Sequence, residues 1–224
     1  MVNAAFRLRQ ASGGAGSPVY NLGFGQMDGT GDMMYTLADL NGNPVPVTHT
    51  GDVVLYFECM PGGGADDTTI TAASGTWERI IFGDGNPPGS PSQAVWIGYN
   101  CSAGLSEIEI IGDSAASGFL VAMVSGLSTN SSIVGDAEYT SGTVISPSVN
   151  DLVVSINWGY DIPEQTPTWS TSQSNSEIGS TTNGPNDTRI INADYVISDG
   201  SPISVQYDSG PGDDRVGIFN LRHA

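Results

Sequence analysis

The chain is built from short segments rich in β-branched and aromatic residues, each ending at a cluster of glycine, proline, asparagine, aspartate or serine. The clearest segment is Asp52 to Met60, DVVLYFECM, which stops at the breaker Pro61-Gly62-Gly63-Gly64. Further segments of this kind are 68–72, 77–82, 94–100, 106–111 and 119–125. No amphipathic helical stretch of about 11 or more residues accompanies them, so the pattern predicts an all-β sandwich or barrel with very little helix.

The second half of the chain loosely repeats the first. Asp52-Val53-Val54-Leu55 is echoed by Asp151-Leu152-Val153-Val154, and Trp77 is echoed by Trp169. The later strands match in the same order: 94–99 with 190–196, 107–111 with 203–207, and 119–125 with 215–221. Because so small a half is not expected to bury both faces of its strands, the halves, about 51–127 and 150–222, are predicted to interleave into one two-layer antiparallel β-sandwich.

Residues 1–50 show no sustained periodicity and are punctuated by glycine-rich turns. They predict an extended N-terminal arm with one or two short strands, ahead of a sandwich domain at 51–224. Arg7 and Arg9, flanked by Phe6 and Leu8, make a small basic and apolar tip on a very acidic chain. Such a tip is either a docking contact or an ordinary frayed terminus.

The excess of acidic over basic residues limits the kinds of partner that the chain is expected to bind. The 224 residues include 24 acidic residues against six arginines and no lysine, which gives a formal net charge of −18. Such a surface repels phosphate, so neither nucleic acid nor an anionic membrane is an expected partner. No apolar run reaches the ~18 residues of a membrane helix, and the first ten residues lack a signal-peptide core.

The two cysteines, Cys59 and Cys101, either pair or remain buried thiols, and free thiols are favoured.

An ordered set of motifs runs through both halves. A strand opening with Gly-Asp or Asn-Asp is followed by a Trp turn, a strand with aromatic content and a closing apolar strand that ends in arginine. The matching pieces are Gly51 to Phe57, Gly75-Thr76-Trp77, Val95 to Tyr99, Gly118 to Leu127, Asn150 to Ile156, Trp169, and Val216 to Arg222. Over residues 51–222 this order resembles the repeated β-sandwich modules of tailed-phage virion proteins and of some bacterial surface proteins.

The resemblance implies a jelly-roll-like sandwich that serves as a structural part of a virion or a cell surface. The favoured function is a non-enzymatic capsid decoration (cement) protein on the capsid surface of a tailed phage. Its partners would be the major capsid protein and copies of itself, in a homotrimer suggested by analogy alone. Phe6, Arg7, Leu8 and Arg9 are the candidate contact residues.

Other functions need different chemistry. Only His49 and His223 are available for a nucleophilic triad, and neither lies near an acidic or nucleophilic motif in the sequence. A glycosidase would use two carboxylates from among Asp52, Glu58, Glu107, Glu109 and Asp113. The alternation Glu107-Ile108-Glu109-Ile110, however, first indicates the solvated face of a strand.

Two kinds of ligand stay open. Paired acidic and amide side chains in turn-rich loops are plausible calcium ligands, although none has the spacing of an EF-hand and no cofactor is predicted. These pairs are Asp66-Asp67, Asp84 with Asn86, Asn186-Asp187 and Asp213-Asp214.

Trp158 and Tyr160 form the aromatic cluster expected to be exposed, which supports the alternative of a receptor-binding or carbohydrate-binding module of a tail appendage or cell-surface protein. Trp77 and Trp169 are expected in the core.

Overall fold

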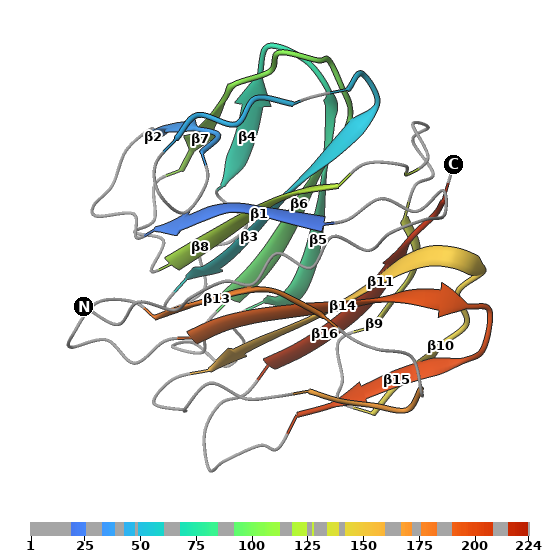
Figure 1. The fold of residues 1–224 in the computed structure, drawn as a ribbon. Helices are drawn as coiled ribbons and strands as arrows, with labels where there is room; N and C mark the ends of the chain where they lie inside the picture. The colour runs from blue at the N-terminus through green and yellow to red at the C-terminus, as the bar shows by residue number, and fades with distance from the viewer. Residues whose placement is uncertain are drawn as a thin grey trace.

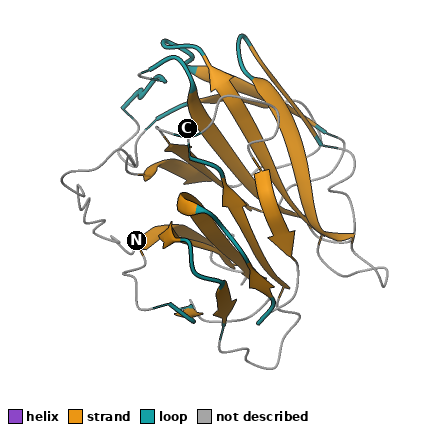
Figure 2. Ribbon diagram, turned by 90° about the vertical axis from the view of Figure 1, so that its right-hand side faces the viewer, coloured by secondary structure: helices purple, strands orange, loops and turns teal. Residues whose placement is uncertain are grey.

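The computed structural model describes residues 19–25, 33–38, 43–47, 49–60, 68–84, 92–112, 118–124, 127, 134–138, 142–159, 167–171, 176–182, 190–207 and 215–223. These residues form strands and loops, as Figure 2 shows, and the prediction of an all-β antiparallel sandwich is confirmed. No helix in this part of the chain is long and apolar enough to cross a membrane.

The first half contributes two sheets. Its strands are β1 (Val19–Gly25), β2 (Met33–Thr36), β3 (Asp52–Met60), β4 (Thr69–Ala72), β5 (Thr76–Asp84), β6 (Ser92–Cys101), β7 (Glu107–Ile111) and β8 (Gly118–Val124). They form a five-stranded sheet in the order β1-β8-β3-β6-β5 and a three-stranded sheet in the order β2-β7-β4. All pairs within both sheets are antiparallel.

The second half repeats this architecture strand for strand. Its strands are β9 (Val134–Glu138), β10 (Val144–Ile145), β11 (Val149–Gly159), β12 (Thr168–Trp169), β13 (Ser176–Thr182), β14 (Ile190–Asp199), β15 (Ile203–Gln206) and β16 (Arg215–Leu221). The sheet orders are β13-β14-β11-β16-β9 and β10-β15-β12. When eight is subtracted from each number, both orders become those of the first half.

The four sheets stack in layers. In Figure 1 the three-stranded sheet β2-β7-β4 lies at the top, the two five-stranded sheets lie in the middle, and β10 and β15 lie at the bottom. Between the layers are three apolar cores, one inside each half and one between the halves. Each half is thus a two-layer sandwich of its own, and the two sandwiches pack through their five-stranded sheets.

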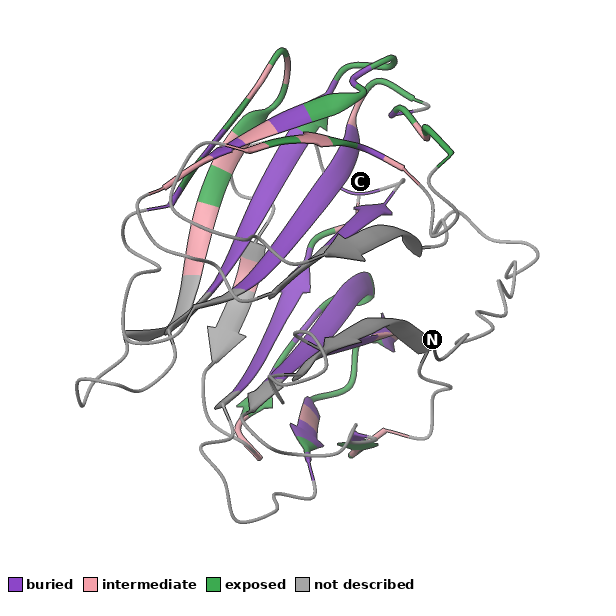
Figure 3. Ribbon diagram, turned by 90° about the vertical axis from the view of Figure 1, so that its left-hand side faces the viewer, coloured by how far each residue is buried: buried purple, intermediate pink, exposed green. Residues whose placement is uncertain are grey.

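The central strands of the middle sheets are buried on both faces. On β3, Val53, Leu55 and Phe57 point into the core between the halves, whereas Val54 and Tyr56 point into the core of the first half. β11 does the same with its own alternation of side chains. This double burial, visible as the fully buried strands of Figure 3, explains why the two segments are nearly continuous apolar runs without polar alternation.

The predicted interleaving of the halves is wrong, because every sheet takes all its strands from one half. The prediction of interleaved halves depends on the assumption that one half has too few strands to cover both faces of its main sheet. In fact each half has eight strands, enough to build a second, smaller sheet over one face. The other half covers the remaining face.

Within residues 1–50 the predicted short strands are present, but they belong to the sheets and not to an arm. Residues 19–25 form β1, which pairs with β8 at the edge of the first five-stranded sheet, and residues 33–36 form β2, which pairs with β7. Leu37 and Val47 are buried in the core of the first half. The body of the protein therefore begins by residue 19, and residues 1–18 lie outside the described residues.

The correspondence of strands between the halves is confirmed, with one exception. β3, β6, β7 and β8 match β11, β14, β15 and β16, as predicted. Trp77, however, lies on β5, whereas Trp169 lies on β12, the counterpart of β4. The two tryptophans are thus not equivalent, although each packs against the core of its own half.

Candidate functional site

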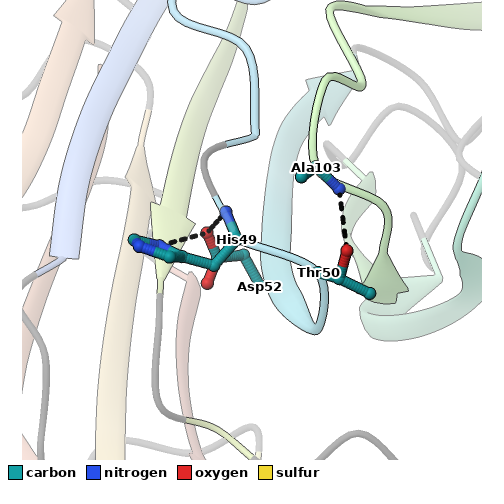
Figure 4. Close-up of polar contacts among 4 residues, drawn as sticks. All are labelled: His49, Thr50, Asp52 and Ala103. Atoms are coloured by element: carbon teal, nitrogen blue, oxygen red, sulfur yellow. Dashed lines mark hydrogen bonds and ion pairs between the residues drawn. The ribbon is translucent and has the colours of Figure 1, made fainter.

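The most regular polar feature is a turn that opens the central strand in each half. Asp52 donates its backbone N–H to the carbonyl of His49 at 3.1 Å, and its Oδ2 accepts the backbone N–H of His49 at 3.0 Å (Figure 4). Asp151 makes the same two contacts with Ser148, at 3.2 and 2.9 Å. Each aspartate therefore closes a four-residue turn with both its backbone and its side chain.

The residue before each aspartate explains the Gly-Asp and Asn-Asp motifs. Gly51 has φ = 101° and Asn150 has φ = 68°, both in the left-handed region. Glycine adopts this conformation without steric cost, and asparagine tolerates it better than most residues. The repeated motif is therefore a turn requirement.

His49 lies beside a carboxylate, contrary to the sequence interpretation that neither histidine is near an acidic group. Its Nδ1 is 3.6 Å from Oδ2 of Asp52, and the imidazole is 77% exposed. Asp52 itself is buried and accepts the turn hydrogen bond from His49. Because Asp151 makes the same turn with a serine in place of the histidine, the His–Asp contact is explained by the turn without any catalytic role.

A second polar feature, here called the Glu58 cluster, lies inside the sandwich of the first half. It consists of Tyr56 and Glu58 on β3, Arg79 on β5, Trp96 on β6, and Thr68 just before β4. Glu58 is fully buried, and among the described residues neither of its carboxylate oxygens has a partner in hydrogen-bonding geometry. The Nε1 of Trp96 is likewise buried without such a partner.

Burial governs the chemistry of Glu58. Desolvation raises the pKa of the carboxyl to about 8. The nearby Trp96, Thr68 and Tyr56 side chains and the charge of Arg79 lower this pKa, but by less than desolvation raises it. These polar groups are close enough to lower the pKa, although none meets the geometric limits of a hydrogen bond to Glu58. At neutral pH the carboxyl is therefore predominantly protonated.

Arg79 is held by other contacts. Its guanidinium carbon lies 5.5 Å from the centre of the Trp96 ring, and its Nη1 donates to the backbone carbonyl of Thr68 at 3.3 Å. These contacts fix the cation above the indole and keep it from fully offsetting the burial of Glu58.

The equivalent place in the second half carries a different polar set. On the central strands, Val54 pairs with Gly98 in the first half, and Val153 pairs with Val196 in the second. Glu58 lies four residues after Val54, and Asn157 lies four residues after Val153, so the two residues correspond. Near Asn157 the buried Ser155 and Tyr207 hydroxyls are 2.7 Å apart, and Nδ2 of Asn192 donates to Oδ2 of Asp194 at 3.1 Å. Burial, and secondarily Asp194, raise the pKa of Tyr207 well above its usual value. These hydrogen bonds satisfy polar groups in an interior that solvent does not reach, and one of them is accepted by the buried carboxyl of Asp194.

Most of the predicted site residues cannot be placed. Phe6, Arg7, Leu8, Arg9 and Tyr160 lie outside the described residues. Trp158 occupies β11, opposite Ile191 and Arg215, but its side chain is not described. The loop residues predicted as calcium ligands also lie outside, except Asp84, for which only the backbone is described at the end of β5. The described residues contain no group of three or more side chains able to hold a metal ion.

The fold separates two of the acidic residues considered for glycoside hydrolysis. Asp52 and Glu58 are six residues apart on one strand, about 20 Å, which is beyond the ~5–9.5 Å of a catalytic pair. Glu107 and Glu109 alternate with the buried Ile108 and Ile110, which confirms the solvated strand face. Asp113 lies outside the described residues.

The cysteines do not form an intrachain bridge. Cys101 is a buried free thiol that pairs across from Asp52, whereas Cys59 lies at the other end of β3, opposite Gln93. The two cysteines are therefore more than 20 Å apart, far beyond the reach of a disulfide.

Comparison with known proteins finds no protein-family model, no curated protein and no solved structure that matches the chain.

Proposed function

We propose that this chain is a structural protein of a virus particle, a decoration protein that stabilises the head of a tailed phage. The observation that carries the proposal is the duplicated architecture. Two sandwiches of eight strands pack through their five-stranded sheets into one four-layer block. Several polar side chains of its interior, among them Asp52, Asp151 and Ser155, are engaged in turns and hydrogen bonds that fix the strands.

The strand order supports a jelly-roll assignment for each half. In the first half β1-β8-β3-β6 form one sheet and β2-β7-β4 the other, and the second half has the same order. This order supports an eight-stranded jelly-roll connectivity in which β5 has moved to the edge of the larger sheet. Because jelly rolls occur in viral capsid proteins and in lectins, the assignment supports a virion part by analogy only.

The mechanism needs no chemistry. A decoration protein binds the assembled shell and not its separated subunits, so its binding free energy adds to the stability of the particle. With a net charge of −18 the body faces solvent, and the arginines near the start of the chain supply the contact with the major capsid protein. We propose Phe6, Arg7, Leu8 and Arg9 for this contact, with trimers as the bound form.

The test is addition of the purified chain to heads stripped of their accessory proteins. Saturable co-sedimentation and a higher temperature of genome release are expected. A variant with Arg7→Ser and Arg9→Ser should bind more weakly, whereas Arg222→Ser, which removes an exposed arginine of the body, should bind normally. Absence of binding to heads, together with binding to a host polysaccharide, would overturn the proposal in favour of a receptor-binding module.

A further inference from the structure

One pair of equivalent buried positions carries a carboxyl in the first half and an amide in the second. Glu58 and Asn157 occupy equivalent places on β3 and β11, and both are buried between the sheets of their own half. Asparagine is neutral at every pH of interest, whereas glutamic acid is neutral only while it keeps its proton. The second half therefore lacks a carboxyl at this position, and its buried carboxyl on β14, Asp194, accepts a hydrogen bond from Asn192.

We propose that Glu58 makes the first half of the chain a pH-responsive unit, which loosens when the carboxyl loses its proton, while the second half with Asn157 does not respond. This inference is independent of the proposed function.

The geometry gives the anion little compensation. Glu58 has no exposed surface, and neither oxygen has a hydrogen-bond partner among the described residues. An ionised carboxylate in such a place costs several kcal/mol unless it is paired and hydrogen-bonded. The cheapest response is a local opening that admits water at the ends of β3 and β6.

The groups that face Glu58 come from several elements. Tyr56 on β3 and Arg79 on β5 are the titratable or charged side chains that act on it, and Trp96 and Thr68 are polar. The core of the first half also contains apolar side chains of β4, β7 and β8, among them Ile70, Ile108, Ile110, Val121 and Met123. Tyr35 on β2 borders the same core, and Asp52 and Cys101 lie at the opposite end of β3. Arg79 is thus the single cation among the described groups that act on Glu58.

The electrostatics of the site agree with this geometry. The pKa of Glu58 is about 8, so the proton is lost within a mildly alkaline range. Opening of the first half should therefore become up to ~10-fold more favourable per pH unit as the pH rises toward about 8, because the opened carboxyl releases a proton that the closed state keeps, and should level off above about 8.

The test is hydrogen exchange of the full chain, followed by mass spectrometry from about pH 6 to about pH 9 and corrected for the intrinsic rate of exchange. Peptides from β3 and β6 should lose protection progressively as the pH rises toward about 8, and no further above it, relative to the equivalent peptides from β11 and β14. In Glu58→Gln the ratio of hydrogen exchange between the peptides of the two halves should not change with pH. Glu107→Gln, which removes an exposed carboxylate of β7, should behave like the wild type.

Two further measurements keep the proposal open to refutation. Asn157→Glu should transfer the alkaline response to the second half. Infrared difference spectra at neutral pH should show a protonated carboxyl band that Glu58→Gln removes. Equal responses of the two halves, an unchanged response in Glu58→Gln, or no band assignable to Glu58 would each overturn the proposal.

Discussion

Asp52 and Asp151 occupy the same place in the two halves of the chain, and each binds the backbone N–H of the residue three positions before it, at 3.0 and 2.9 Å. Asp151 accepts two further hydrogen bonds. Nδ2 of Asn220 donates to its Oδ2 at 2.7 Å, and the backbone N–H of His223 donates to its Oδ1 at 3.1 Å. This one carboxylate thus connects the start of β11 with the end of β16.

Replacing Asp151 with alanine should lower the free energy of unfolding by about 3 kcal/mol, because it leaves buried donors without their charged acceptor. Chemical denaturation measures the loss. Glu78→Ala, at an exposed position on β5, should change stability by no more than about 0.5 kcal/mol. A loss at Asp151 as small as that at Glu78 would contradict the assigned contacts.

Gly98 should not tolerate a side chain while Trp77 is present. A Cβ at position 98 would lie 2.7 Å from the Trp77 ring, although the equivalent position in the second half is Val196. Gly98→Val should therefore cost about 2 kcal/mol. Trp77→Val should relieve most of that cost, and a double-mutant cycle measures the coupling. Additive effects of the two substitutions would show that the ring does not lie over Gly98.

Removing one hydroxyl of the Ser155–Tyr207 pair should lower the stability of the chain more than removing both hydroxyls. Tyr207→Phe leaves a buried serine hydroxyl without the partner 2.7 Å away, at a cost of about 1 to 2 kcal/mol. The double change Ser155→Ala with Tyr207→Phe should recover part of this loss. Tyr195→Phe, on the partly buried β14 face, serves as the control. Equal stability of the single and double variants would argue against the bond.

Stability should fall with rising pH because of Glu58. Its pKa is about 8 in the folded chain against an ordinary value of 4.5, so the folded state holds the proton more tightly between these pH values. The stabilisation is complete below pH 4.5 and is lost as the pH rises through 8, by up to ~1.4 kcal/mol per pH unit.

Glu58→Gln should remove this dependence and make the chain more stable than the wild type above pH 8. Denaturant titrations of both proteins across this range measure the difference. A difference that stays constant with pH would contradict the buried, protonated state of Glu58.

The sequence predicts much of the fold because its strands are short and sharply bounded. Asp52 to Met60 forms the strand expected of it, and the echo of Asp52 by Asp151 marks equivalent strands. The layering was missed, although the unbroken apolar run of β3 indicates burial on both faces. Short strands are expected within residues 1–50, but their place in the sheets as β1 and β2 is not, because glycine-rich edge strands carry little periodic pattern.

The polar interior could not be predicted in the same way. Glu58 stands in the sequence as one of several strand carboxylates, and only the register of β3 against β6 shows that it lies inside the first sandwich. Its neighbours Thr68, Arg79 and Trp96 come from three other parts of the chain. Burial of this kind depends on tertiary contacts, which the local pattern of residues does not record.

The central claim is that the chain decorates a phage head, and electron cryo-microscopy of stripped heads saturated with the purified chain tests it most directly. We predict density at repeated positions of the capsid lattice, each fitted by the four-layer block, with trimers around local three-fold axes. Heads that carry no such density, or density confined to the tail, would contradict the claim.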